Sequence, residues 1–150
     1  MLIRKASLTD SETIYDLVNY YANKGLMLSR SRSSIYEYIR NYSVMEINGQ
    51  VVGIGALSIF WSDLAEIRTL AVKKSFLRQG IGKKLVEHFI EEAKELGIKK
   101  IFTLTYQEDF FGKCGFLTTN KEEMPHKIWK DCLDCPKFPN CDEVLMIKKI

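Results

Sequence analysis

Residues 66–83 have the sequence EIRTLAVKKSFLRQGIGK, and the rest of the chain is arranged around this stretch. It begins with apolar, β-prone residues typical of a strand, and it ends at Gly80-Ile81-Gly82, where a long helix opens. Two glycines there remove the Cβ atoms that would hold a ligand away from the backbone. The first turn of a helix carries unpaired N–H groups and the positive end of the helix dipole. The stretch is therefore suited to bind an anion such as a pyrophosphate, although the same glycines also fit a plain tight turn.

Composition limits the class of protein. The chain has 150 residues, of which 46% are hydrophobic and 27% charged, as is usual for one soluble globular domain. No apolar run is long enough to span a bilayer, and the first residues lack the hydrophobic region of a signal peptide. The net charge of +3 is too small to indicate a nucleic-acid partner. We therefore expect a single domain over residues 1–150, located in the cytoplasm, without nucleic-acid or membrane partners.

The N-terminal half predicts two helices and a three-stranded antiparallel meander. A strand is expected over residues 2–4, followed by a helix that is capped by Thr9, with Glu12 three residues on, and that stops at Gly25. A polar connection leads to a second helix, whose inner face would consist of Ile35, Tyr38, Ile39 and Tyr42. Strands are expected over residues 43–47 and 51–61, then from residue 66. Asn48-Gly49 between the first two is a strong hairpin signal, because both turn positions need a positive φ.

Two glycines in the second strand of the hairpin, Gly53 and Gly55, indicate a bulge or a face that another group approaches closely. The helix that opens at Gly80 is expected to run to about Leu96. Strands over residues 100–105, from 114 and over 143–149, and a short helix over 107–113, complete the prediction. A strand–helix–strand unit of this length implies a right-handed parallel crossover. The fold class is therefore α/β, with a mixed, mostly antiparallel sheet flanked by helices.

The order of these elements, together with Leu77-Arg78-Gln79-Gly80-Ile81-Gly82, resembles the GNAT acyltransferases, which use acetyl-CoA to acetylate amines. The segment FFGKCGF, residues 110–116, is similar to the aromatic-x-x-x-Gly-Phe segment of that family. Leu77 stands where the family has Gln or Arg, and Phe111 stands where many members have a tyrosine that protonates the leaving thiolate. The resemblance narrows at residues 27–32, 61–72, 104–106, 110–111 and 125–132. These stretches look like the acetyltransferase domain of N-acetylglutamate synthase in its short, stand-alone form.

The resemblance implies how acetyl-CoA would bind. The backbone around residues 79–83 would cradle the pyrophosphate, and residues 70–72 would pair with pantetheine as an added strand. A gap would open between this strand and its parallel neighbour, residues 101–105. The expected cofactor-binding residues are Leu70, Ala71, Val72, Leu77, Arg78, Gln79, Gly80, Ile81, Gly82, Lys83 and Phe111.

Three residues are candidates for catalysis. Glu66 would act as base on the amine, directly or through one water, since an α-ammonium with a pKa near 8 loses its proton readily. The alternative is an ordinary strand-end charge paired with Arg68. The backbone N–H of Leu70 would donate to the developing oxyanion. Tyr106 is a candidate acid, with a packing tyrosine as the alternative, and the coenzyme A thiolate can also leave without an acid.

An amino-acid acceptor has to be held by its carboxylate, and a guanidinium fork matches a carboxylate in bidentate fashion. Arg30 is the first candidate for this role and Arg32 the second, with Arg68 as a further partner. Glutamate brings a second carboxylate, so more than one cation would be needed.

Three cysteines, Cys132, Cys135 and Cys141, lie within ten residues. They are able to hold zinc with Cys114 or His126 as a fourth ligand, but the spacing lacks a second Cys-x-x-Cys pair. Reduced thiols in a proline-stiffened loop, or a redox pair, are the alternatives, and we favour the absence of metal. The aromatic residues and prolines of the same segment are expected to form a lid or the surface of a homodimer.

Three functions are compatible with these residues. The first is synthesis of N-acetylglutamate from glutamate and acetyl-CoA, the entry to arginine biosynthesis, which Glu66 and the Arg30/Arg32 cluster favour. The second is acetylation of glutamine, another amine or a protein N-terminus. The third is a non-catalytic sensor that binds acetyl-CoA, which Phe111 and Leu77 favour.

Overall fold

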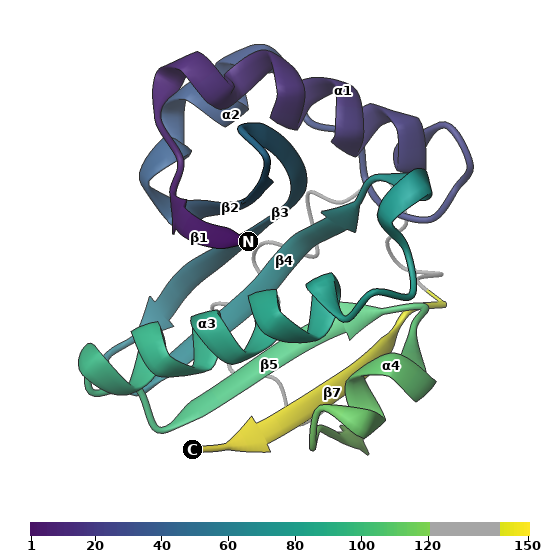
Figure 1. Ribbon diagram of the computed structural model, residues 1–150. Coiled ribbons are helices and arrows are strands. Elements are labelled where there is room, and N and C mark those ends of the chain that lie inside the picture. Colours follow the sequence, from purple (N-terminus) through teal and green to yellow (C-terminus); the bar gives the residue numbers. More distant parts are fainter. Residues whose placement is uncertain (121–141) are drawn as a thin grey trace. The chain divides into compact units, whose positions relative to one another are not determined.

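The computed structural model describes residues 1–120 and 142–150 (Figure 1). Within these ranges seven strands hydrogen-bond in the order β1-β2-β3-β4-β5-β7-β6. The strands are β1 (Leu2–Lys5), β2 (Tyr42–Ile47), β3 (Gln50–Trp61), β4 (Leu64–Val72), β5 (Lys100–Thr105), β6 (Leu117–Thr119) and β7 (Val144–Lys149). The α-helices are α1 (Ser11–Ala22), α2 (Arg32–Glu37), α3 (Ile81–Glu95) and α4 (Glu108–Lys113). The described residues also form the 3-10 turns η1 (Leu8–Asp10), η2 (Ile39–Asn41) and η3 (Lys74–Phe76).

The predicted class, α/β with a mixed and mostly antiparallel sheet, is confirmed. Two compact units share the sheet: Met1–Ser58 with Ile67–Glu92, and Ile59–Glu66 with Ala93–Ile150. No helix in the described ranges is both long and apolar enough to cross a membrane.

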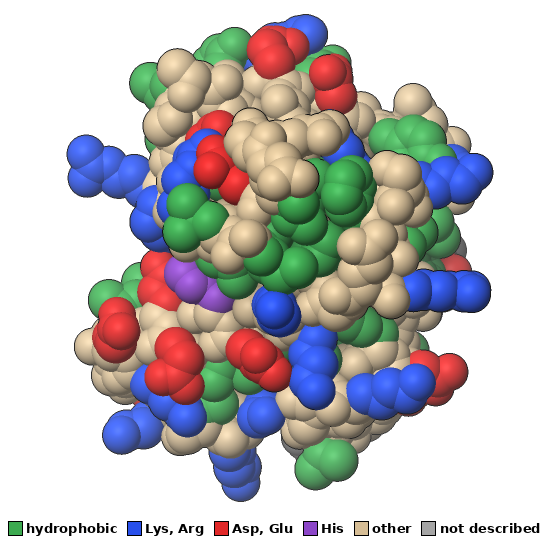
Figure 2. Space-filling model, in the orientation of Figure 1, with side chains coloured by type: hydrophobic (Ala, Val, Ile, Leu, Met, Phe, Trp, Pro, Cys, Tyr) green, Lys and Arg blue, Asp and Glu red, His purple; other side chains and the backbone are tan. Residues whose placement is uncertain are grey.

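The first unit has a helix layer on each side of its strands. On one side α1 and α2 pack together against β2 and β3 (Figure 1). The buried residues of that layer are Ile14, Leu17, Val18, Ile35, Tyr42, Val44, Val51, Ile54, Ala56 and Ala71. On the other side lies α3, whose outward side chains are a mixture of lysines and acids (Figure 2).

Gly53 and Gly55 of β3 allow α3 to approach the sheet. A Cβ at Gly53 would lie 2.9 Å from Ile81 Cγ2, and one at Gly55 would lie 2.7 Å from Phe89 Cε2. The predicted close approach is therefore confirmed. A bulge is present as well, because the register passes from Met45↔Gly53 to Glu46↔Val51 and skips one residue of β3.

The Asn48-Gly49 turn is also confirmed. Both residues have positive φ, 52° and 76°, and they join β2 to β3 in an antiparallel pair.

The second unit includes α4 and the strands β5, β7 and β6, with the start of β4 along one edge of these strands. Leu64–Glu66 of β4 pair in parallel with Lys100–Phe102 of β5, which confirms the predicted parallel connection. The antiparallel strand β7 lies between β5 and β6. One face is closed by the cluster Leu64, Phe102 and Leu145, with Phe60, Leu104 and Ile147 packed around it.

Two predictions for the N-terminal helices are wrong. The capping box is not at Thr9, because it consists of Ser7 and Asp10 around η1, and α1 begins at Ser11. Asp10 is fixed there because its carboxylate accepts two hydrogen bonds from the Arg4 guanidinium, at 2.7 and 3.0 Å.

The second helix is shorter than predicted. It begins at Arg32, where the Ser31 hydroxyl accepts a hydrogen bond from the Ser34 N–H, and it ends at Glu37. A 3-10 turn follows, and Tyr42 is the first residue of β2. The 3.6-residue spacing of Tyr38 and Tyr42 thus does not mark one helix face, since Tyr38 is exposed and Tyr42 is buried.

Candidate active site

The centre of the candidate site is a distortion of β4 at Thr69. Its φ is 59°, a left-handed conformation that is costly for a β-branched residue. Its side chain hydrogen-bonds with the buried hydroxyl of Tyr42 on β2. A residue with this φ departs from the regular extended backbone of the strand.

The positive charges of two arginines from different segments act on the same tyrosine hydroxyl. Arg30 comes from the connection between α1 and α2, and Arg68 precedes the distortion on β4. Burial raises the pKa of the Tyr42 hydroxyl, and the positive charge of Arg30, the bond with Thr69 and the charge of Arg68 each oppose that rise. Both arginine residues are half-buried. Two positive charges that act on one buried tyrosine form a suitable environment for an anionic ligand.

Arg32, the second predicted member of the clamp, points elsewhere. Its guanidinium donates to both carboxylate oxygens of Glu12, at 2.7 and 3.1 Å, and it lies 4.0 Å from the ring centroid of Tyr15. The charges of Arg30 and Arg68 thus both act on Tyr42, whereas Arg32 lies in an exposed ion pair.

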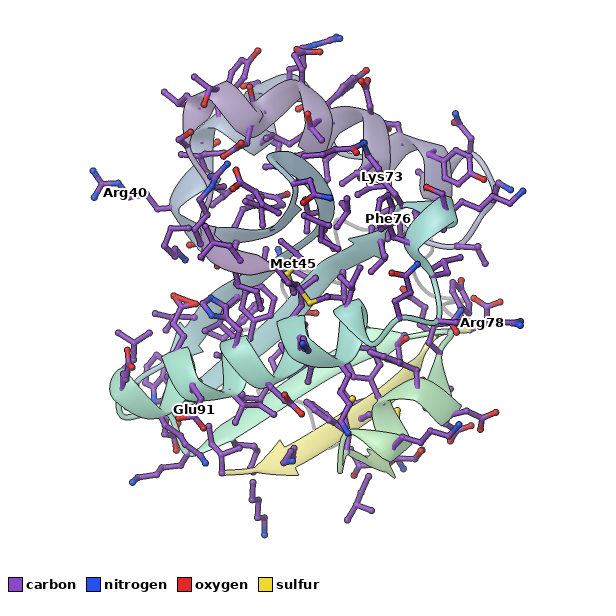
Figure 3. All side chains as sticks on the ribbon, in the orientation of Figure 1. Arg40, Met45, Lys73, Phe76, Arg78 and Glu91 are labelled. Carbon is purple, nitrogen blue, oxygen red and sulfur yellow. The ribbon has the colours of Figure 1, made fainter. Side chains whose placement is uncertain are left out.

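The turn between β4 and α3 has the backbone needed for a phosphate site. Arg78 and Gly80 both have positive φ, 63° and 78°. The first bond of α3 runs from the Lys84 N–H to the Gly80 carbonyl, at 3.1 Å. The amides of residues 81–83 precede this bond, where helix N–H groups are available to a ligand. Figure 3 shows Lys73 and Phe76 at the start of the turn and the Arg78 side chain projecting outward. The backbone of this turn and the amides of residues 81–83 therefore fit a pyrophosphate.

The residues between the distortion and the turn are extended. The Lys73 N–H donates to the Val52 carbonyl of β3 at 2.8 Å, which fixes the direction of the last peptide of β4. Leu70 is half-buried, whereas Ala71 and Val72 are buried. Leu77, in the turn itself, is 47% exposed.

Glu66 is a buried carboxylate on β4, with 7% of its surface exposed. It precedes Arg68 by two residues in the same strand, and alternate residues of a strand point to the same face.

The other predicted site residues lie in the second unit. The Tyr106 hydroxyl donates to Asp142 Oδ1 at 2.5 Å. Phe111 of α4 is buried between the rings of Phe110 and Phe116, with centroid distances of 5.0 and 5.3 Å. Cys132, Cys135, Cys141 and His126 lie outside the described residues. Among the residues that the structure describes, no cluster of His, Cys, Asp and Glu is able to hold a metal ion.

Sequence reasoning missed two residues of this site, Tyr42 and Thr69. Tyr42 matched a helical pattern, and Thr69 is an ordinary strand residue with no local sign of positive φ. Their hydrogen bond joins segments 27 positions apart, so no pattern within one segment could have indicated it.

The chain belongs to the acetyltransferase (GNAT) family, whose model matches residues 12–116. It is therefore an acyltransferase of this class, as the sequence indicated. The matched segment includes the distorted part of β4 and the turn that leads into α3, residues 70–83.

Individual relatives of this chain include proteins described as amino-acid acetyltransferases. The chain is 41% identical to an uncharacterized N-acetyltransferase of Chlorobaculum tepidum, over 99% of this chain and 96% of the relative. It is 37% identical to the amino-acid acetyltransferase of Mycobacterium tuberculosis, over 77% and 67%. It is also 34% identical to the amino-acid acetyltransferase of Neisseria meningitidis, but it spans only 30% of that longer protein.

Similar proteins are also found among solved structures. The chain is similar to Rv2747 from Mycobacterium tuberculosis, solved in complex with CoA, with a TM-score of 0.88, 28% identity and coverage of 100% and 99%. It is similar to N-acetylglutamate synthase from Neisseria gonorrhoeae, complexed with coenzyme A and N-acetyl-glutamate, with a TM-score of 0.91 and 29% identity. In that comparison 99% of this chain is covered but only 34% of the synthase.

Proposed function

We propose that this protein transfers the acetyl group of acetyl-CoA to the α-amine of an amino acid, and that L-glutamate is the acceptor. The observation that carries the proposal is that the charges of Arg30 and Arg68 both act on Tyr42, which hydrogen-bonds with Thr69 at the distortion of β4. An α-amino acid presents a carboxylate next to its amine, and two half-buried arginines supply the matching charge. Similarity to amino-acid acetyltransferases and to N-acetylglutamate synthase supports the same acceptor class.

The reaction forms a C–N bond to the acetyl carbonyl and breaks its C–S bond, and coenzyme A leaves as a thiolate. Glu66 takes the proton of the amine, directly or through one water. The Leu70 N–H donates to the carbonyl oxygen as it gains charge. The direction of the Lys73 N–H supports this role, because Leu70 has the same strand parity as Val72 and its backbone then faces away from β3.

The turn before α3 binds the pyrophosphate of acetyl-CoA through the amides of residues 81–83, with Arg78 as an adjacent cation. Arg32 takes no part in holding the acceptor, because it is paired with Glu12. The Tyr106 hydroxyl is already donated to Asp142, so the thiolate leaves without an acid or Tyr106 passes on a proton shared with that carboxylate.

The test is a screen of free amino acids with acetyl-CoA, in which thiol release is followed. Glutamate should give the highest kcat/KM, and glutamate α-amide, which lacks the α-carboxylate, should be a poor acceptor. If the α-amide reacts as well as glutamate, the carboxylate clamp does not exist. If glutamine reacts better than glutamate, the clamp stands and the acceptor is wrong. Binding of acetyl-CoA without turnover of any amine would favour the sensor.

A further inference from the structure

The last turn of α1 is tied to the end of β4 by a single side chain. The Tyr21 hydroxyl donates to the carbonyl oxygen of Val72, at 2.5 Å. In Figure 1 the arrowhead of β4 ends beneath the C-terminal part of α1. Tyr21 is half-buried, and burial raises the pKa of its hydroxyl, so the group is a neutral donor at physiological pH. Its ring packs edge-on to Tyr20 at a centroid distance of 5.0 Å.

The direction of the Val72 carbonyl follows from the other half of the same peptide. The N–H of that peptide belongs to Lys73, and it donates to Val52 of β3 at 2.8 Å. In a trans peptide the C=O and N–H point in opposite directions. The Val72 carbonyl therefore points away from β3, to the opposite edge of β4, and Tyr21 reaches that edge from α1.

The family resemblance implies that the pantetheine of acetyl-CoA pairs with residues 70–72, and this is the edge of β4 that β3 leaves free for it. Pantetheine carries amide N–H groups, and they need backbone acceptors in a strand-like pairing. A carbonyl oxygen has two lone pairs, and the Tyr21 hydroxyl uses one of them. The second remains for a ligand amide, in a direction that the first bond helps to fix.

We propose that Tyr21 is a positioning residue for acetyl-CoA: its hydroxyl orients the Val72 carbonyl so that this oxygen accepts a hydrogen bond from a pantetheine amide. The inference rests on the proposed function, because it requires acetyl-CoA along this edge. It adds a residue on α1, outside the strand and the turn, that distinguishes the pantetheine arm from the nucleotide.

The test compares two ligands in Tyr21→Phe, which keeps the ring and removes only the hydroxyl. Coenzyme A contains the pantetheine arm, and adenosine 3′,5′-bisphosphate lacks it. Calorimetry should show the Kd of coenzyme A rising about threefold to tenfold, the range of one lost neutral hydrogen bond. The Kd of the bisphosphate should stay unchanged. Tyr20→Phe, on the adjacent ring, is the matched control and should alter neither value.

The outcomes separate this inference from the proposed function. Unchanged or tighter binding of coenzyme A by Tyr21→Phe overturns the positioning role, and tighter binding would show that the hydroxyl competes with the ligand. An equal loss for both ligands also overturns it, since the hydroxyl would then only support the fold. If the wild-type protein binds no coenzyme A, the cofactor assignment itself fails and this inference fails with it.

Discussion

At the scale of single residues, Thr69 of the candidate site has a backbone conformation that is unfavourable for a β-branched side chain. A β-branched residue at a φ of 59° stores on the order of 1–3 kcal/mol of strain. Its side chain hydrogen-bonds with the buried hydroxyl of Tyr42. Strain of this kind gathers at functional sites, where the surrounding structure over-determines the backbone. Here it lies between the proposed base, Glu66, and the proposed oxyanion donor, Leu70.

Arg30→Ala should weaken binding of the acceptor and leave acetyl-CoA untouched. Removing one partner of a partly buried, charge-assisted pair costs about 2–5 kcal/mol, so the KM for glutamate should rise roughly tenfold or more. Steady-state kinetics with each substrate varied in turn will measure this. Arg32→Ala is the matched control, because its guanidinium belongs to Glu12. A larger effect from Arg32→Ala than from Arg30→Ala would contradict the assignment.

Glu66→Gln should lower turnover at pH 7 and restore part of it at higher pH. Above about pH 8 an α-amine is already neutral, so the lost base matters less. A positioned base contributes about 10²- to 10⁴-fold, which sets the scale of the loss. The pH–rate profile of kcat/KM is the measurement, with the exposed Glu87→Gln of α3 as the control. A variant profile parallel to wild type would make Glu66 a structural residue.

At the scale of elements, the contact of α3 with β3 depends on the absence of side chains at Gly53 and Gly55. Gly55→Ala should destabilise the fold by about 1–3 kcal/mol, because the new methyl would lie 2.7 Å from Phe89 Cε2 and 3.1 Å from Leu70 Cδ1. Gly112→Ala in α4 meets nothing within 4 Å and should be neutral or stabilising by up to about 1 kcal/mol. Urea unfolding of both variants checks this. Equal stability of the two would mean that α3 moves aside freely.

The elements that the sequence predicted correctly are those fixed by local rules. Asn48-Gly49 allows the positive φ of a tight hairpin, and Gly80 supplies the positive φ that opens α3. The elements predicted wrongly depend on distant partners. Thr9 matches the sequence pattern of a helix cap, but the cap forms around Asp10, whose carboxylate accepts hydrogen bonds from Arg4 of β1. Tyr42 matches a helical spacing in the sequence, but it belongs to β2, where it pairs with Ala56 of β3.

The candidate site likewise has one part that local sequence rules predict and one part that depends on contacts between distant segments. The proposed anion-binding turn can be predicted from the sequence, because two glycines and a helix start are local signals. The joint effect of Arg30 and Arg68 on Tyr42 involves three segments, and no spacing in the sequence encodes it. No local pattern distinguishes Arg30 from Arg32 either, because the pairing of Arg32 with Glu12 joins two distant segments.

At the scale of the whole molecule, stability should depend on pH through the network of Arg4, Asp10 and Glu46. Arg4 donates to both carboxylates, and this holds the pKa of Asp10 below its ordinary value of about 3.9. A depressed pKa means that the ionised form stabilises the fold, so this contribution is complete above pH 4 and is lost as the pH falls through the lower, folded-state pKa.

Asp10→Asn should accordingly cost about 2 kcal/mol at pH 7, the range for a hydrogen-bonded charged group. The difference in unfolding free energy between wild type and variant should shrink as the pH falls below 4. Urea titrations at several pH values will measure it. Glu12→Gln removes an exposed partner of Arg32 and is the control, with no measurable change expected. A difference that does not vary with pH would show that the Asp10 charge is not the stabilising feature.

The position of β7 between β5 and β6 has a consequence for the order in which the protein is made. A ribosome delivers β5 and β6 first, and β7 is the strand that pairs with both. Until residues 144–149 emerge, the edge of β5 that β7 later covers stays open, and β6 has no place in the sheet that the structure describes. An open strand edge is a template for another chain. The nascent protein is therefore exposed to association during the interval that separates the synthesis of β5 from that of β7.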